Sequence, residues 1–128
     1  MRGVCIALFG AAEKGKLAYP YLCKELLDLF HILGSPPEDT RGLRLAMQTI
    51  LRGGQVWYFR VEEEGFSERH YESGFRYLEK ERAKAPIDAL FLPGVSDYLL
   101  VESAKKVCRK RNCLLVFEEG DLFDYLMG

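Results

Sequence analysis

The sequence has few of the features that metal sites, membrane spans and nucleic-acid surfaces require. Its two histidines, His31 and His70, have no second histidine at a spacing that metal ligands use. Its 18 Lys and Arg residues are balanced by 19 Asp and Glu residues, whereas binders of extended nucleic acid normally carry a basic excess. No apolar run approaches the roughly 18 residues of a membrane span. We therefore expect no metal, no cofactor, no extended nucleic-acid partner and no membrane partner.

Cysteine is present, but not in a pattern that indicates metal binding. Cys5, Cys23, Cys108 and Cys113 form neither a C-x-x-C pair nor a zinc-finger spacing. Cys5 and Cys113 fall in strand-like runs, where a free thiol behaves as a small buried hydrophobe. The first ten residues lack the cleavage site of a signal peptide and are typical of a strand. These features predict a cytoplasmic protein with reduced cysteines and one domain over residues 1–128.

Strand-like runs alternate with segments of helical periodicity along the chain. The runs predict strands over residues 4–9, 55–61, 88–92 and 113–117. The periodic segments predict helices over residues 22–33, 43–51, 68–84 and 100–108, with a short terminal helix containing Leu122, Phe123 and Leu126. This alternation predicts an α/β fold, a small doubly wound (Rossmann-like) parallel sheet of about four to five strands with helices on both faces.

Loops after the strands are the expected ligand sites, because doubly wound sheets bind ligands outside the carboxyl ends of their strands. The first loop (GAAEKGKL) is one residue short of a Walker A motif. Gly10 and Ala11, with Lys14 or Lys16, could hold a phosphate there, although Leu17 replaces the hydroxyl that binds Mg²⁺. Residues 10–16 therefore indicate either P-loop-like NTP binding or a glycine turn with solvated lysines.

Acidic residues follow the second predicted strand. Glu62, Glu63 and Glu64 stand where an acid often meets a ribose hydroxyl in Rossmann folds, and they also suit a solvated acidic turn. Within that strand, Trp57, Tyr58 and Phe59 are consecutive, so large aromatic side chains face both sides of the sheet. Helices or a partner subunit must cover both sides, which favours a homodimer.

Three segments resemble, in order, the LONELY GUY (LOG-like) family. They are residues 41–56 (RGLRLAMQTILRGGQV), 88–94 (DALFLPG) and 113–126 (CLLVFEEGDLFDYL). The resemblance implies a Rossmann-like, usually dimeric enzyme that hydrolyses the N-glycosidic bond of nucleoside 5′-monophosphates. It also implies a nucleotide or another small phosphorylated molecule as the ligand.

The resemblance also assigns roles to residues. It implies that Pro93, Gly94, Ser96 and Asp97 bind phosphate, and that Glu102 is catalytic together with an arginine of the preceding helix. Arg76 is the first candidate for that arginine and Arg69 is the second.

The chain departs from the family loop P-G-G-x-G-T-x-x-E. Val95 replaces the second glycine, and Asp97-Tyr98 replaces Gly-Thr. Asp97 would bring negative charge to the phosphate, and either Ser96 or Asp97 also suits the N-cap of the next helix. The departures therefore leave a second hypothesis open, a non-catalytic binding or assembly module that has the fold without the phosphate loop.

Overall fold

The computed structural model describes residues 3–80, 86–118 and 120. The described strands are β1 (Cys5–Gly10), β2 (Tyr21–Cys23), β3 (Gln55–Arg60), β4 (Ala89–Phe91) and β5 (Leu114–Val116). The described helices are α1 (Leu26–Leu33), α2 (Gly42–Leu51), α3 (Glu68–Lys80) and α4 (Tyr98–Arg111). None of these helices is both long and apolar enough to cross a membrane.

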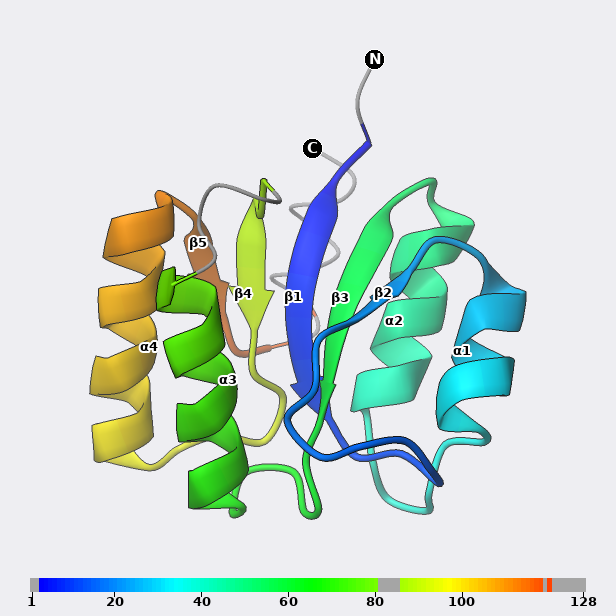
Figure 1. Cartoon of the computed structure of the whole chain (residues 1–128), viewed down its shortest axis with the longest axis horizontal. Helices are drawn as coiled ribbons and strands as arrows, with labels where there is room; N and C mark the ends of the chain where they lie inside the picture. The colour runs from blue at the N-terminus through cyan, green and yellow to red at the C-terminus, as the bar shows by residue number, and fades with distance from the viewer. Residues whose placement is uncertain (1–2, 81–85, 119, 121–128) are drawn as a thin grey trace.

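β1 is the centre of a five-stranded sheet with the order β2-β3-β1-β4-β5 (Figure 1). It pairs in parallel with β3 on one side and with β4 on the other, and β4 pairs in parallel with β5. β2 pairs antiparallel with β3, so the sheet is mixed at that end. All six residues of β1 are buried, as expected for an apolar strand that is covered on both faces.

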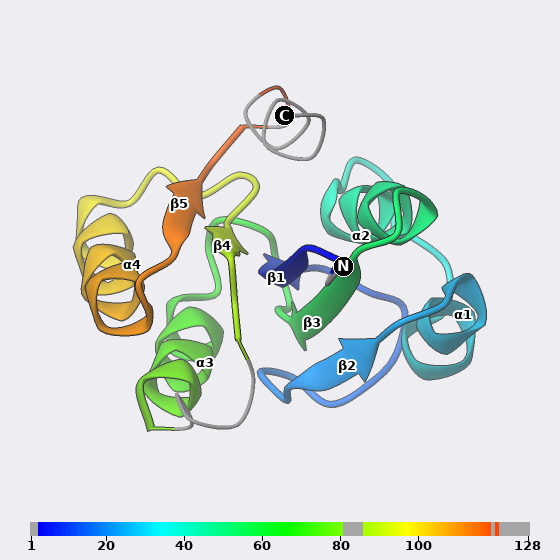
Figure 2. The same ribbon diagram turned by 90° about the horizontal axis from the view of Figure 1, so that it is seen from above.

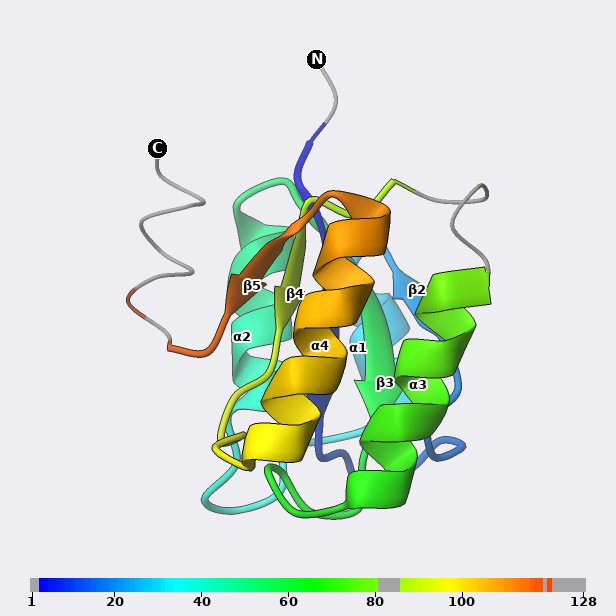
Figure 3. The same ribbon diagram turned by 90° about the vertical axis from the view of Figure 1, so that its left-hand side faces the viewer.

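Helices cover both faces of the sheet (Figures 2 and 3). Ile6 and Leu8 of β1 belong to the apolar cluster that contains α1 and α2, while Ala7 and Phe9 belong to the cluster that contains α3 and α4. This division follows from the alternation of side chains along a strand. The predicted fold, a small Rossmann-like α/β sheet with helices on both faces, is confirmed.

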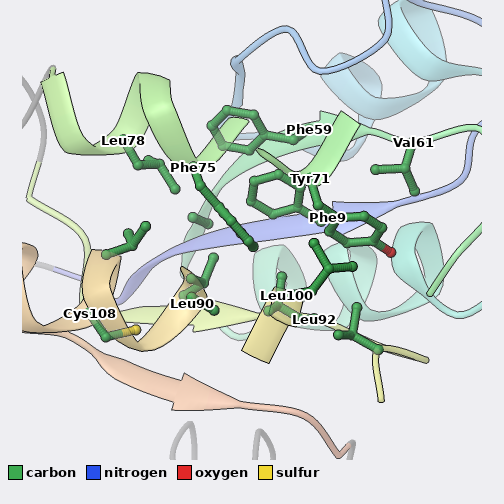
Figure 4. Packing of buried hydrophobic residues seen from close by; sticks show 14 of the residues in the cluster. Phe9, Phe59, Val61, Tyr71, Phe75, Leu78, Leu90, Leu92, Leu100 and Cys108 are labelled. Carbon is green, nitrogen blue, oxygen red and sulfur yellow. The ribbon is translucent and has the colours of Figure 1, made fainter. Parts of the chain in front are cut away.

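Aromatic packing joins β1 and β3 to α3 (Figure 4). The rings of Phe9 and Phe59 stack with centroids 4.5 Å apart, and Phe75 meets Phe9 edge-on at 5.1 Å. Such pairs add to the stabilisation that comes from burial alone. The consecutive aromatic residues of β3 are distributed as expected, with Tyr58 in the cluster on one face and Phe59 in the cluster on the other.

The first predicted helix begins later than expected. Periodicity places Leu22 in this helix, but the residue lies in β2, where it pairs with Trp57. The helix begins at Leu26, because the Asp28 carboxylate accepts hydrogen bonds from the Lys24 and Glu25 amides. These two bonds hold the pKa of Asp28 below its usual value. Gly34 ends the helix as predicted, with a φ of 77°.

The remaining predicted elements agree with the structure to within a few residues. The predicted helix over residues 68–84 is observed as α3 to Lys80, and its last four predicted positions lie outside the described residues. The terminal helix predicted around Leu122, Phe123 and Leu126 also lies outside the described part of the chain.

Candidate functional site

The carboxyl ends of β1, β3 and β4 meet at one edge of the sheet, where α2, α3 and α4 begin (Figure 1). From β1 the chain passes through β2, α1 and α2 to β3 on one side, and it then crosses through α3 to β4 on the other side. The strand order therefore reverses beside β1, which is the position where open α/β sheets bind ligands.

The Glu64 side chain connects three segments at this edge: its own loop after β3, the loop after β1 and the start of α2. Its carboxylate accepts hydrogen bonds from the amides of Ala11 (2.9 Å), Arg41 (2.9 Å) and Gly42 (2.8 Å). Because the last two amides lie at the start of α2, the carboxylate occupies the anion position at that helix N-terminus. The Ala11 amide, which we predicted would bind a phosphate, binds this internal carboxylate instead.

β1 and the start of α2 approach each other closely at Gly10 and Gly42, beside the Glu64 carboxylate. A Cβ on Gly10 would lie 2.7 Å from the Cα of Gly42, and a Cβ on Gly42 would lie 2.9 Å from Oε2 of Glu64. The buried Tyr58 hydroxyl lies beside both glycines and donates a hydrogen bond to the Ala11 carbonyl at 2.7 Å. Burial first, and the negative charge of Glu64 second, raise the pKa of Tyr58 well above its usual value.

A hollow of about 340 Å³ opens beside this contact, between the loops that follow β1 and β3. We call it the acidic hollow. Its lining includes Glu38, Asp39, Glu62 and Glu63, whose side chains are exposed, together with the Glu64 side chain. Phe66 stands at its rim with 74% of its surface exposed. The hollow therefore presents acceptors for hydroxyl or amine hydrogens, and an aromatic ring.

A second hollow, of about 460 Å³, lies next to the acidic hollow, because the amide of Arg41, which lines the second, donates a hydrogen bond to Glu64, which lines the first. We call it the Arg41 hollow. Its lining comprises Arg41, Gly94, Val95, Ser96, Phe117, Glu118 and Gly120. Arg41 is the only basic residue in the described lining of either hollow.

The structure brings some of the predicted ligand residues to these hollows. Ala11 lines the acidic hollow, Gly94 and Ser96 line the Arg41 hollow, and Pro93 is buried beneath the same loop. Asp97 is the N-cap of α4, and its carboxylate accepts hydrogen bonds from the amides of Leu99 (2.8 Å) and Leu100 (3.2 Å). The N-cap interpretation of Asp97 is thus confirmed.

The glycine-rich loop after β1 differs from a Walker loop in conformation. A Walker loop leads directly into a helix, whereas residues 10–17 lead into β2, and α1 begins only at Leu26. The amides of Glu13 and Lys14 donate to the carbonyl of Leu33, both at 3.1 Å. The Lys16 ammonium lies 5.5 Å from the centre of the Tyr19 ring. Neither Lys14 nor Lys16 lines the two hollows.

The two residues expected to be catalytic, Arg76 and Glu102, line neither of the two hollows. Arg76 is exposed on α3 and lines a groove of about 290 Å³ together with Glu72, Glu79 and Lys106. Glu102, on α4, forms an ion pair with Lys105 at 3.3 Å. Arg69, the second candidate for the arginine, lines another hollow, of about 410 Å³, which shares Glu62, Glu63 and Phe66 with the acidic hollow.

Two residues of the site were not singled out as binding residues from the sequence. Arg41 belongs to the segment that resembles the LOG-like family, but no role was assigned to it. Glu64 was grouped with Glu62 and Glu63, and nothing in three consecutive glutamates indicates which one folds back onto a helix. No group of three or more His, Cys, Asp or Glu residues suited to a metal ion is found in the described part of the chain.

Comparisons with protein-family models, with curated proteins and with solved structures found no match to this chain. The resemblance to the LOG-like family therefore stays a prediction from the sequence.

Proposed function

We propose that the protein binds a nucleotide across the carboxyl ends of β3, β1 and β4. The ligand's sugar and base would lie in the acidic hollow and its phosphate in the Arg41 hollow. The observation that carries this proposal is the pair of neighbouring hollows at the reversal of strand order. The described lining of one is rich in carboxylates, and that of the other contains Arg41 and a single acid, Glu118.

The acidic hollow suits the sugar and base. The carboxylates of Glu62 and Glu63 accept hydrogen bonds from hydroxyl groups, as acids do for ribose in Rossmann folds. The exposed ring of Phe66 offers a flat apolar surface on which a base can stack. Four exposed carboxylates would repel a phosphate in the acidic hollow, whereas the Arg41 hollow has one exposed acid, Glu118, beside its arginine. The charges therefore favour this direction of the ligand.

The Arg41 hollow suits the phosphate. A guanidinium group binds phosphate oxygens through paired hydrogen bonds, and the loop at Gly94 and Ser96 faces the same space. The helix N-termini nearby are not free for this purpose, because Glu64 caps α2 and Asp97 caps α4. Binding of the phosphate therefore depends on the Arg41 side chain.

We propose binding without N-glycosidic hydrolysis, which corresponds to the non-catalytic module considered from the sequence. The positions of Arg76 and Glu102 favour this choice, because neither residue lines the two hollows that would hold the ligand. The carboxylates that do line the acidic hollow, Glu62 and Glu63, bind the sugar hydroxyls in this proposal.

A thermal-shift panel tests the proposal. Ribonucleoside 5′-monophosphates should raise the midpoint of unfolding in proportion to the logarithm of their concentration, and ribose 5-phosphate should raise it less. Chromatography after incubation should detect no free base above the rate without protein. A panel in which no monophosphate raises the midpoint overturns the binding proposal, and release of base overturns its non-catalytic part.

A further inference from the structure

The turn between α4 and β5 brings two cysteines together. Asn112 adopts the left-handed conformation with a φ of 54°, and the Cys113 amide donates to the Cys108 carbonyl at 3.1 Å. This is the six-residue hydrogen bond of a Schellman motif, in which the side chains of the two bonded residues commonly touch.

Strand alternation points the Cys113 side chain toward α4. Cys113, Leu115 and Phe117 all pack against the apolar cluster that contains α3 and α4, whereas Val116 belongs to the opposite cluster. Cys108, on α4, is a member of that same first cluster and is 9% exposed, and Figure 4 shows it among the buried residues of the cluster. Both thiols therefore occupy one side of the sheet at the same turn.

The two thiols have different surroundings. The pKa of the Cys113 thiol lies below its ordinary value, because it shares a hydrogen bond with Cys108 and lies near the Arg111 guanidinium. The same hydrogen bond and burial raise the pKa of the Cys108 thiol. Cys113 is also partly exposed, so it is the thiol that a reagent in solution reaches first.

We propose that Cys108 and Cys113 form a reversible disulfide by exchange with a low-molecular-weight disulfide such as glutathione disulfide. The Cys113 thiolate attacks one sulfur of the reagent, which forms a mixed disulfide and releases one glutathione thiolate. Cys108 then loses its proton to solvent, attacks the Cys113 sulfur and releases the second glutathione. Two protein thiols are oxidised and one glutathione disulfide is reduced to two thiols.

Peptide mapping after exposure to glutathione disulfide tests this modification site. Free thiols are alkylated and the unreduced protein is digested with trypsin, which cleaves between the two cysteines at residues 109–111. We expect the Cys108 and Cys113 peptides to be linked, with a loss of about 2 Da relative to the two free peptides. Reduction with dithiothreitol should separate them again.

Cysteine variants distinguish the thiol that attacks the reagent, Cys113, from the thiol that closes the disulfide, Cys108. In Cys108→Ser the mixed disulfide on Cys113 should accumulate, because the second thiol is missing. In Cys113→Ser, modification of Cys108 should be at least about tenfold slower than modification of Cys113 in the first variant. Cys23→Ser is the matched control and should keep the linked peptides, since Cys23 is buried in the other cluster. Persistence of the mixed disulfide on Cys113 in the unmodified chain, linkage to Cys5 or Cys23, or no reaction would overturn the proposal.

Discussion

At the scale of single residues, three consecutive glutamates have different surroundings. Glu62 and Glu63 are exposed at the acidic hollow, while the carboxylate of Glu64 accepts three main-chain hydrogen bonds. The sequence indicates an acidic turn, but the partners of Glu64 lie 22 to 53 residues away along the chain. Contacts of that kind depend on the completed fold, so they are not visible in a local pattern.

Replacing Glu64 with alanine should lower the free energy of unfolding by about 2 kcal/mol, because three amides lose their acceptor and α2 loses its cap. Urea denaturation monitored by circular dichroism measures this change. Glu63→Ala is the matched control and should change the free energy by less than about 0.5 kcal/mol, since its side chain is exposed. Equal effects of the two substitutions would show that Glu64 is a surface residue in solution.

Tyr58 should make the protein sensitive to alkali. Its pKa is raised in the folded state, so its contribution to stability is complete below the unfolded value of about 10 and is lost as the pH rises above it. Tyr58→Phe should lower the free energy of unfolding at pH 7 by about 1 kcal/mol, through loss of the bond to Ala11. Its stability should then fall less steeply than that of the unmodified protein above pH 10.

Urea midpoints measured from pH 7 to pH 11 test the role of Tyr58. Tyr71, whose pKa is raised to about 12 mainly by burial, leaves some alkaline dependence in the variant. Tyr19→Phe is the control, because that ring is 48% exposed. An unchanged dependence in Tyr58→Phe would rule out ionisation of this hydroxyl as a cause of alkaline unfolding.

At the scale of elements, hydrophobic periodicity predicted the four parallel strands and the helices between them, but not β2. The reason is that Leu22 fits the helical spacing of Leu26 and Leu29, while the strand is three residues long. Pairing with β3 is what stabilises β2, and no local signal reports that pairing. The capping interaction of Asp28 could not be predicted either, because the position of an aspartate in a helical pattern does not show that its carboxylate binds the Lys24 and Glu25 amides.

The close approach of β1 and the start of α2 depends on two glycines, Gly10 and Gly42. In an open helix, Gly42→Ala would raise stability by up to about 1 kcal/mol, because alanine is the better helix former. Here it should lower stability by more than about 2 kcal/mol, because the new Cβ would press on the Gly10 Cα and the Glu64 carboxylate.

Thermal and urea denaturation measure the sign of this effect. Arg44→Ala, an exposed position two residues further along α2, is the control and should change stability by less than about 0.5 kcal/mol. A stabilised Gly42→Ala variant would contradict the close approach of β1 and α2.

At the scale of the whole molecule, the place of the candidate site follows from topology more directly than its proposed chemistry does. Alternating strands and helices predicted a parallel sheet, and such a sheet implies a ligand site at the carboxyl ends of its strands. The order in which the strands pair decides which loops lie next to each other at those strand ends, and therefore which charged side chains line the two hollows. The sequence thus predicts that the loops at Ala11 and at Gly94 line the candidate site, and they do line the two hollows. Four other predicted residues lie outside the hollows: Lys14, Lys16, Arg76 and Glu102.

In the proposed complex the phosphate of the nucleotide lies at Arg41. Isothermal titration of a ribonucleoside 5′-monophosphate and of the same nucleoside without phosphate, into the unmodified protein and into Arg41→Ala, tests this position directly. The substitution should weaken binding of the monophosphate about tenfold or more and leave binding of the nucleoside unchanged, with Arg44→Ala altering neither. Equal loss for both ligands, or no loss for the monophosphate, would contradict the account.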